Sequence, residues 1–121
     1  MDIGFVVDSS DAVEWSKMLN YITNVVEYFY DNVNSNIGIG LVTYGDTAKV
    51  AIPLNSVSGP KKDILKSIGD IQQQGGSSSG FSQAMQLVPS FFSPQQGGRV
   101  GVREVNLYGI NGSLKIGRAH V

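Results

Sequence analysis

Three short segments of the chain carry carboxylate, amide and hydroxyl groups that could bind a metal ion. Residues 8–11 read Asp-Ser-Ser-Asp and directly follow an apolar run, residues 76–80 read Gly-Ser-Ser-Ser-Gly, and residues 111–113 read Asn-Gly-Ser. Hard divalent cations such as Mg²⁺ prefer oxygen ligands and keep several of their waters. The three segments could supply those oxygens if the fold brings them together.

The first half of the chain predicts a strand, a helix and a hairpin. Residues 3–7 are a continuous apolar run, which is typical of a strand buried on both faces. Apolar residues recur at three- and four-residue spacing over residues 15–33, which indicates an amphipathic helix of about five turns. Residues 37–44 predict a second strand, and the alternation over residues 48–54 predicts a third. Because Pro53 cannot donate to a ladder, we expect the third strand at a sheet edge.

The second half predicts two helices and one more strand. Pro60 opens a short helix that carries Ile64, Leu65, Ile68 and Ile71. Residues 72–80 form a polar loop, in which the glutamines at 72–74 are expected to be solvated. A further helix starts near Phe81 and is expected to stop near Pro89, and residues 100–110 predict a fourth strand.

This order of elements predicts an α/β fold of the Rossmann-like, doubly wound type. Its sheet is mainly parallel, with helices on both faces and one antiparallel edge strand. Ligands of such sheets bind beyond the carboxyl ends of the strands, where the strand order reverses. We therefore expect the three polar segments to meet at that rim.

Several stretches of this sequence resemble one known family. Residues 2–13 (DIGFVVDSSDAV), 36–54 (NIGIGLVTYGDTAKVAIPL) and 75–80 (GGSSSG) are similar to the von Willebrand factor type A domain, also called integrin inserted-domain-like. The resemblance extends from Asp2 to about Ser113. It implies an incomplete domain of this family over residues 1–115, lacking the last strands and their helices.

The resemblance also implies a metal-ion-dependent adhesion site, which this chain matches in part. Asp8 and Ser10 match the first two ligands of the D-x-S-x-S motif, but its third ligand position is Ala12. Ser77 stands for the family's Thr, and Asn111 stands where a second Asp belongs. Exchanging a carboxylate for an amide removes an attraction of roughly 4 kcal/mol for a unit pair at 4 Å. We therefore expect binding of Mg²⁺ or Mn²⁺ that is weak or absent.

The function that the resemblance implies is adhesion, not catalysis. A metal held at Asp8 and Ser10 would capture an acidic side chain of a protein ligand, such as collagen or another matrix protein, in an extracellular setting. The alternative is a metal-independent scaffold that binds partners through loops and helix faces. If both metal and adhesion fail, Asp8 and Ser10 would only cap the helix and tie down the loop.

Composition excludes other classes. The 121 residues suffice for one domain, and the net charge of −1 provides no basic surface for nucleic acid. The chain has no cysteine, so disulfides and thiolate sites are excluded. No apolar run approaches the ~20 residues that would insert into a membrane.

Three other interpretations of the polar segments stay open. Residues 76–80 fit the G-x-S-x-G pattern of serine hydrolases with Ser78 as nucleophile, but that pattern requires a preceding strand and a histidine base. The same loop could hold a phosphate at a helix N-terminus, although it lacks the Gly-Lys-Ser/Thr ending of nucleotide-binding loops. Asn111 also lies in an N-glycosylation pattern.

The C-terminal segment, residues 116–121, has the sequence IGRAHV. Its back-translation resembles a common short-read sequencing adapter, so we interpret it as adapter sequence and not as part of the domain. The segment contains His120, the one histidine of the chain. A genomic sequence that encodes the same residues at this locus would contradict this interpretation.

Overall fold

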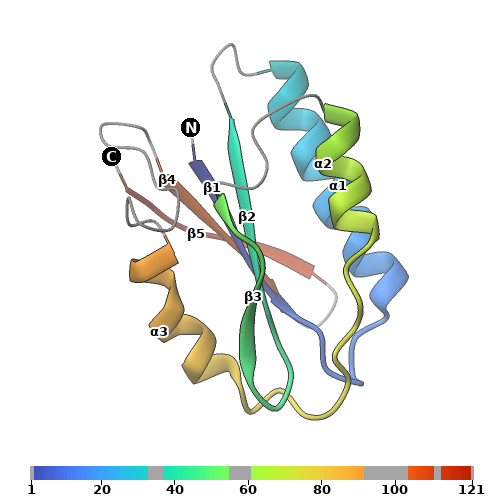
Figure 1. The fold of residues 1–121 in the computed structure, drawn as a ribbon, viewed down its shortest axis with the longest axis vertical. Coiled ribbons are helices and arrows are strands. Elements are labelled where there is room, and N and C mark those ends of the chain that lie inside the picture. Colours follow the sequence, from blue (N-terminus) through green and yellow to red (C-terminus); the bar gives the residue numbers. More distant parts are fainter. Residues whose placement is uncertain (1, 33–36, 55–60, 92–103, 111–112, 121) are drawn as a thin grey trace.

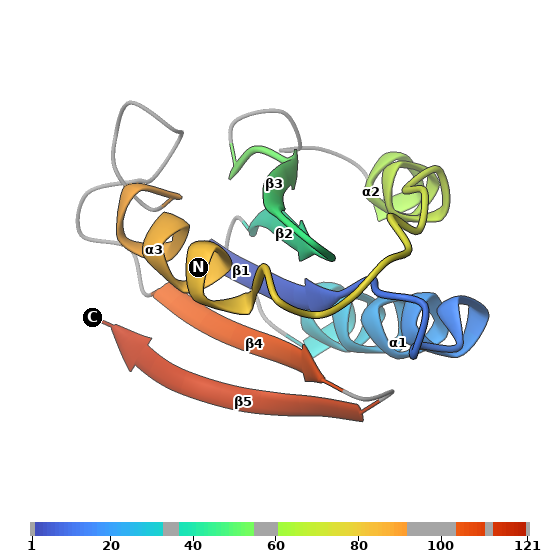
Figure 2. The same cartoon turned by 90° about the horizontal axis from the view of Figure 1, so that it is seen from below.

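The computed structural model describes residues 2–32, 37–54, 61–91, 104–110 and 113–120, which form one sheet and three helices. The strands are β1 (Asp2–Asp8), β2 (Gly38–Tyr44), β3 (Ala48–Ile52), β4 (Glu104–Ile110) and β5 (Ser113–His120). The helices are α1 (Trp15–Asn32), α2 (Lys61–Gly69) and α3 (Phe81–Phe91). Helices α1 and α2 cover one face of the sheet and α3 covers the other (Figures 1 and 2).

The sheet has the strand order β3-β2-β1-β4-β5. Its centre is parallel, because β1 pairs in parallel with both β2 and β4. Strand β3 pairs antiparallel with β2 at one edge, as predicted. These features confirm the predicted doubly wound α/β fold. The strand order reverses at β1, so the carboxyl ends of β1 and its neighbours are where a site is expected.

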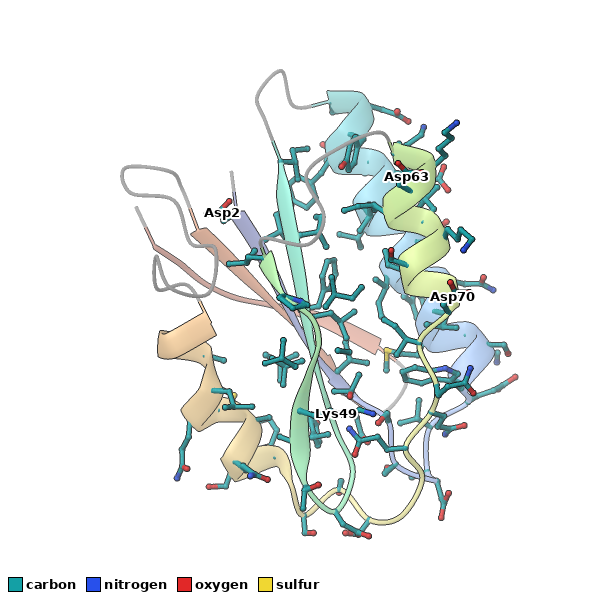
Figure 3. The ribbon with its side chains drawn as sticks, viewed as in Figure 1. Asp2, Lys49, Asp63 and Asp70 are labelled. Carbon is teal, nitrogen blue, oxygen red and sulfur yellow. The ribbon has the colours of Figure 1, made fainter. Side chains whose placement is uncertain are left out.

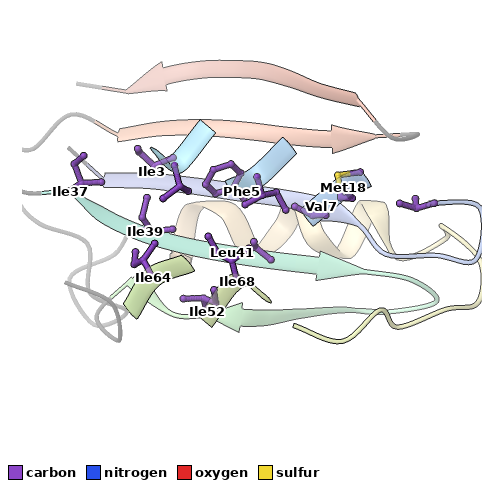
Figure 4. Packing of buried hydrophobic residues seen from close by; sticks show 13 residues of the cluster. Ile3, Phe5, Val7, Met18, Ile37, Ile39, Leu41, Ile52, Ile64 and Ile68 are labelled. Carbon is purple, nitrogen blue, oxygen red and sulfur yellow. The ribbon is translucent and has the colours of Figure 1, made fainter. Parts of the chain in front are cut away.

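Strand β1 is buried on both faces, as its continuous apolar run predicts. Side chains alternate across a strand, so Ile3, Phe5 and Val7 pack against α1 and α2 (Figure 4). Val6 packs on the α3 side. The apolar stripe of α1 contributes Met18, Ile22 and Val26 to the same core. Each fully buried side chain of this size stabilises the fold by roughly 1.5–3 kcal/mol.

Two elements differ from the sequence prediction. Helix α3 runs through Pro89 to Phe91 instead of stopping before the proline. Pro89 lies in the last turn, so its missing N–H removes only one helical hydrogen bond before the helix ends. Strand β4 begins at Glu104, and residues 100–103 of the predicted strand lie outside the described residues.

Strand β5 adds an antiparallel strand beside β4 that the sequence prediction did not include. Its backbone pairs from Ser113 opposite Ile110 to His120 opposite Glu104. The strand includes residues 116–120 of the segment interpreted as adapter sequence. Backbone pairing does not test where a sequence originates, so that interpretation stays a prediction.

Candidate functional site

The carboxyl ends of β1 and β2 meet two loops and form a rim, which we define as residues 8–12, 45–47 and 73–80. It lies at the lower edge of the molecule in Figure 1. Asp8 and Tyr44 are the last paired residues of the two strands, and the Ser9 N–H then donates to the Tyr44 carbonyl over 2.8 Å. Figure 3 labels Asp2, which lies at the opposite end of β1 and away from the rim.

Backbone hydrogen bonds hold the Gly/Ser loop against the end of β1. The Gly75 N–H donates to the Ser9 carbonyl over 2.9 Å, and the Asp11 N–H donates to the Gly76 carbonyl over 2.9 Å. The loop is anchored earlier by the Trp15 indole N–H, which donates to the Ile71 carbonyl over 3.1 Å. Two of the predicted polar segments therefore meet, as expected.

The glutamines of this loop do more than face solvent. The Gln73 amide Nε2 donates to the carbonyls of Ser10 and Val13 over 2.8 and 3.0 Å. The Gln74 Nε2 donates to the Thr43 hydroxyl over 2.7 Å. Gln72 and Gln73 are exposed, as a solvated loop predicts, whereas Gln74 is half-buried; Gln73 and Gln74 in addition donate hydrogen bonds to the protein. The Gln73 amide supplies a donor to two carbonyls of the turn after β1, and the Gln74 amide supplies one to a side chain of β2.

Asp8 and Ser10 are both buried at the rim, with 2% and 1% of their surfaces exposed. The Ser10 N–H donates to the Asp8 Oδ1 over 2.9 Å. The Ser10 hydroxyl, in contrast, has no hydrogen-bond partner within the part of the chain that the structure describes. An unpaired buried hydroxyl costs free energy, typically about 1–3 kcal/mol, so such a group calls for an explanation, of which a bound ion is one.

The pKa of Tyr44 responds to the charge of the Asp8 carboxylate. Burial, and to a lesser extent the negative charge of Asp8, raise the pKa of Tyr44 to about 12. The Tyr44 ring also contacts Phe81 edge to face, with ring centroids 5.4 Å apart. Tyr44 therefore links the acidic end of the rim to the start of α3.

Ser77 lies at the rim in contact with Asp46. The Asp46 Oδ1 accepts the Ser77 hydroxyl over 2.7 Å and the Ser77 N–H over 2.9 Å. These two hydrogen bonds, the side-chain one first, lower the pKa of Asp46. The sequence analysis treated Gly45-Asp46 only as a turn between strands. The sequence feature that could have identified Asp46 as a site residue is a carboxylate in a turn at the rim where ligands are expected.

The described residues fit a hard cation in part. Asp8 and Ser10 offer a buried carboxylate and an unpaired hydroxyl, which are suitable oxygen ligands. Ala12 is exposed and has no side-chain oxygen, Ser77 is bonded to Asp46, and Asn111 lies outside the described residues. Within residues 2–32, 37–54, 61–91, 104–110 and 113–120, no three His, Cys, Asp or Glu side chains form a metal-binding group.

The structure also bears on the serine hydrolase interpretation and on membrane insertion. Ser78 lies in an exposed loop that follows α2 and precedes α3, so the strand that a nucleophile elbow requires is not there. Among the helices of the described residues, none has the length and apolar character to cross a bilayer.

Comparisons with known proteins agree with this geometry. The model of the von Willebrand factor type A domain family matches residues 2–110. The von Willebrand factor A domain-containing protein 2 of Xenopus laevis is 30% identical over 86% of the chain. The von Willebrand factor of Rattus norvegicus is 28% identical over 82%. The chain spans only 13% and 24% of these two relatives.

Solved structures of proximal thread matrix protein 1 from the mussel byssus share the fold. One is 23% identical with a TM-score of 0.79, covering 88% of this chain and 29% of that protein. Another, described as having a zinc-occupied MIDAS motif, is 24% identical with a TM-score of 0.72, covering 83% and 28%. Figure 1 shows the three-layer arrangement to which this likeness applies.

Proposed function

Because this chain belongs to the von Willebrand factor type A domain family, a family of protein-interaction and adhesion modules, we propose that partner proteins bind at its rim. The rim is the point where the strand order reverses, and three distant parts of the sequence meet there. Binding, with no chemical turnover, is the activity that its residues support.

The unpaired hydroxyl of Ser10 carries this proposal. It is buried beside Asp8, and it is the one buried side-chain oxygen or nitrogen without a hydrogen-bond partner among the described residues. A ligand that binds oxygen would satisfy the hydroxyl and complete the site. Ser10 is therefore better explained by binding than by capping of α1.

A weakly bound Mg²⁺ or Mn²⁺ is the cation class that suits these residues. Asp8 and Ser10 would hold it, and Asn111 would be a further ligand. Ser77 could bind it only after its hydrogen bond to Asp46 is broken. When bound, such a cation supplies positive charge and an open coordination position for a partner's carboxylate. Asp8 provides negative charge from a position that is 2% exposed.

Calorimetric titration of the chain with Mn²⁺ tests this proposal. Asp8→Asn keeps the side-chain shape and removes the charge, so it should weaken Mn²⁺ binding at least tenfold, as loss of one favourable ion pair implies. Asp63→Asn, on the exposed surface of α2, is the matched control and should leave binding unchanged (Figure 3). Equal Mn²⁺ affinity in the chain and in Asp8→Asn would contradict the proposal.

Metal-independent binding is the second candidate, and a separate surface feature favours it. An open cavity of about 530 Å³ lies between β3 and the end of α2, lined by residues 49–52, Ser67 and residues 70–72. Adhesion to immobilised collagen separates the two candidates. Rim binding predicts loss with EDTA, whereas binding at this cavity predicts loss with Ser67→Arg and no effect of EDTA.

We further propose an extracellular setting and a matrix-type protein ligand, such as collagen. The support is that the similar proteins include von Willebrand factor and a byssus matrix protein. Secretion of the full-length parent protein into the medium of producing cells would agree with this setting, and retention in the cytosol would contradict it.

A further inference from the structure

We propose that Asp46 sets the cation affinity of the rim by holding Ser77 away from metal coordination. This inference rests on the proposed function, because it concerns the same rim. Asp46 would be a positioning residue that acts through Ser77 and that makes the site weaker than its ligands alone would allow.

The hydrogen bonds of Ser77 support this role. Its hydroxyl donates to the Asp46 Oδ1 over 2.7 Å, lies 2.8 Å from the Ser79 hydroxyl and accepts the Ser79 N–H over 3.2 Å. A serine hydroxyl has one donor and two acceptor positions. The Ser77 hydroxyl hydrogen is therefore committed to Asp46 and one acceptor position to the Ser79 N–H, so these contacts fix the orientation of the hydroxyl.

Ser10 provides the contrast within the same rim. Its hydroxyl is buried and has no hydrogen-bond partner in the described part of the chain, whereas the exposed Ser77 is hydrogen-bonded to Asp46 and Ser79. A cation could recruit Ser10 without breaking a protein hydrogen bond. Recruiting Ser77 requires that its contact with Asp46 be broken first.

The backbone is shaped to admit the Asp46 carboxylate. Gly76 has a φ of +76°, and a Cβ at this position would lie 2.7 Å from the Asp46 Oδ2. Any side chain larger than hydrogen would push the carboxylate away. The Ser79 hydroxyl adds a contact of 3.4 Å to the Asp46 carbonyl, and the Gly80 N–H donates to the Gly45 carbonyl over 2.8 Å, so the turn and the loop are also joined beyond Ser77.

The test compares Mn²⁺ affinities in a double-mutant cycle. Asp46→Ala should raise the Mn²⁺ affinity about tenfold, the smaller end of the effects known for residues that orient metal ligands. Adding Ser77→Ala should abolish that gain, because the freed hydroxyl is its source. Asp46→Asn keeps an oxygen acceptor and should give a smaller gain.

Asp11→Ala is the matched control for charge. Asp11 is exposed at the same rim, and its removal takes away one negative charge without freeing a hydroxyl. It should weaken Mn²⁺ binding, in the opposite direction to Asp46→Ala. A second readout is amide hydrogen exchange in EDTA, where Asp46→Ala should speed exchange at Ser77 and Ser79.

Two results would overturn the proposal. One is an Asp46→Ala variant that binds Mn²⁺ no more tightly than the unchanged chain. The other is a gain that persists in the double variant, because the gain would then not come from Ser77. Failure of the proposed function has a different signature, which is unchanged Mn²⁺ binding in Asp8→Asn.

Discussion

Asp8 and Tyr44 face each other across the last register pair of β1 and β2, and the charge of Asp8 acts on the Tyr44 phenol. Tyr44 is buried, so its ionisation is opposed first by the loss of hydration and then by the neighbouring carboxylate. This pair places a negative charge at the inner end of the rim. The absorbance of the Tyr44 phenol can therefore be used to detect that charge.

The pKa of Tyr44 should depend on Asp8. Asp8→Asn should lower it from about 12, yet leave it above the ordinary value of 10.0, because burial is the larger cause. The folded chain binds the phenolic proton more tightly than the unfolded chain does, so stability should fall as the pH rises from 10 toward 12. Absorbance titration at the phenolate band measures this step.

Two tyrosine variants assign that step. Tyr44→Phe should remove the late ionisation, while Tyr28→Phe, at a side chain that is 62% exposed, should leave it in place. If the ionisation near pH 12 persists in Tyr44→Phe, it does not come from Tyr44, and this would contradict the account of that residue.

The two neighbouring serines of the rim should respond in opposite ways to alanine. Ser10→Ala removes an unpaired buried hydroxyl, so the metal-free chain should be unchanged or more stable by up to about 1 kcal/mol. The same change should weaken Mn²⁺ binding. A site kept for binding at a cost in stability behaves in this way.

Ser9→Ala is the matched comparison. The Ser9 hydroxyl donates to the Tyr44 carbonyl over 3.2 Å and accepts the Gln74 N–H over 3.4 Å. Its loss should destabilise the chain by about 1 kcal/mol. Urea unfolding measures both variants, and a larger loss for Ser10→Ala than for Ser9→Ala would mean that Ser10 has a structural role instead.

Close backbone contact at Gly80 should make this residue intolerant of a side chain. A Cβ at Gly80 would lie 2.7 Å from the Thr47 carbonyl carbon and 2.8 Å from the Gly45 oxygen, both of them backbone atoms. Gly80→Ala should therefore cost about 1–3 kcal/mol of stability. Gly69→Ala should be neutral or stabilise by up to about 1 kcal/mol, because that position is open and helical. Equal thermal midpoints for the two variants would contradict this account of the rim.

The sequence predicted the fold well because hydrophobic period and burial agree in most elements. The apolar run of β1 and the stripe of α1 are direct consequences of which faces are buried. The continuation of α3 through Pro89 could not be read from local propensity, since a proline in a final turn costs little. Strand β5 was missed although Asn-Gly, at residues 111–112, is a strong hairpin signal.

The candidate site was predicted in part. The meeting of residues 8–11 with the Gly/Ser loop follows from strand topology, and the structure places them together. The pairing of Ser77 with Asp46 could not be predicted, because it depends on how the loop lies over the β2–β3 turn. The hydrogen bonds of Gln73 and Gln74 could not be predicted either, since a polar loop sequence does not tell which amides donate back to the protein. Asn111 as a metal ligand stays a prediction.

The central claim is that the rim binds a cation through Asp8 and Ser10, and NMR of the chain with Mn²⁺ tests it most directly. Paramagnetic broadening falls off steeply with distance, so low Mn²⁺ concentrations mark the nearest amides. We predict that the amide signals of Ser9, Ser10 and Asp11 broaden first, and that Asp8→Asn removes this effect. Broadening centred on the exposed carboxylates of Asp31 or Asp63, or none at the rim, would contradict the account.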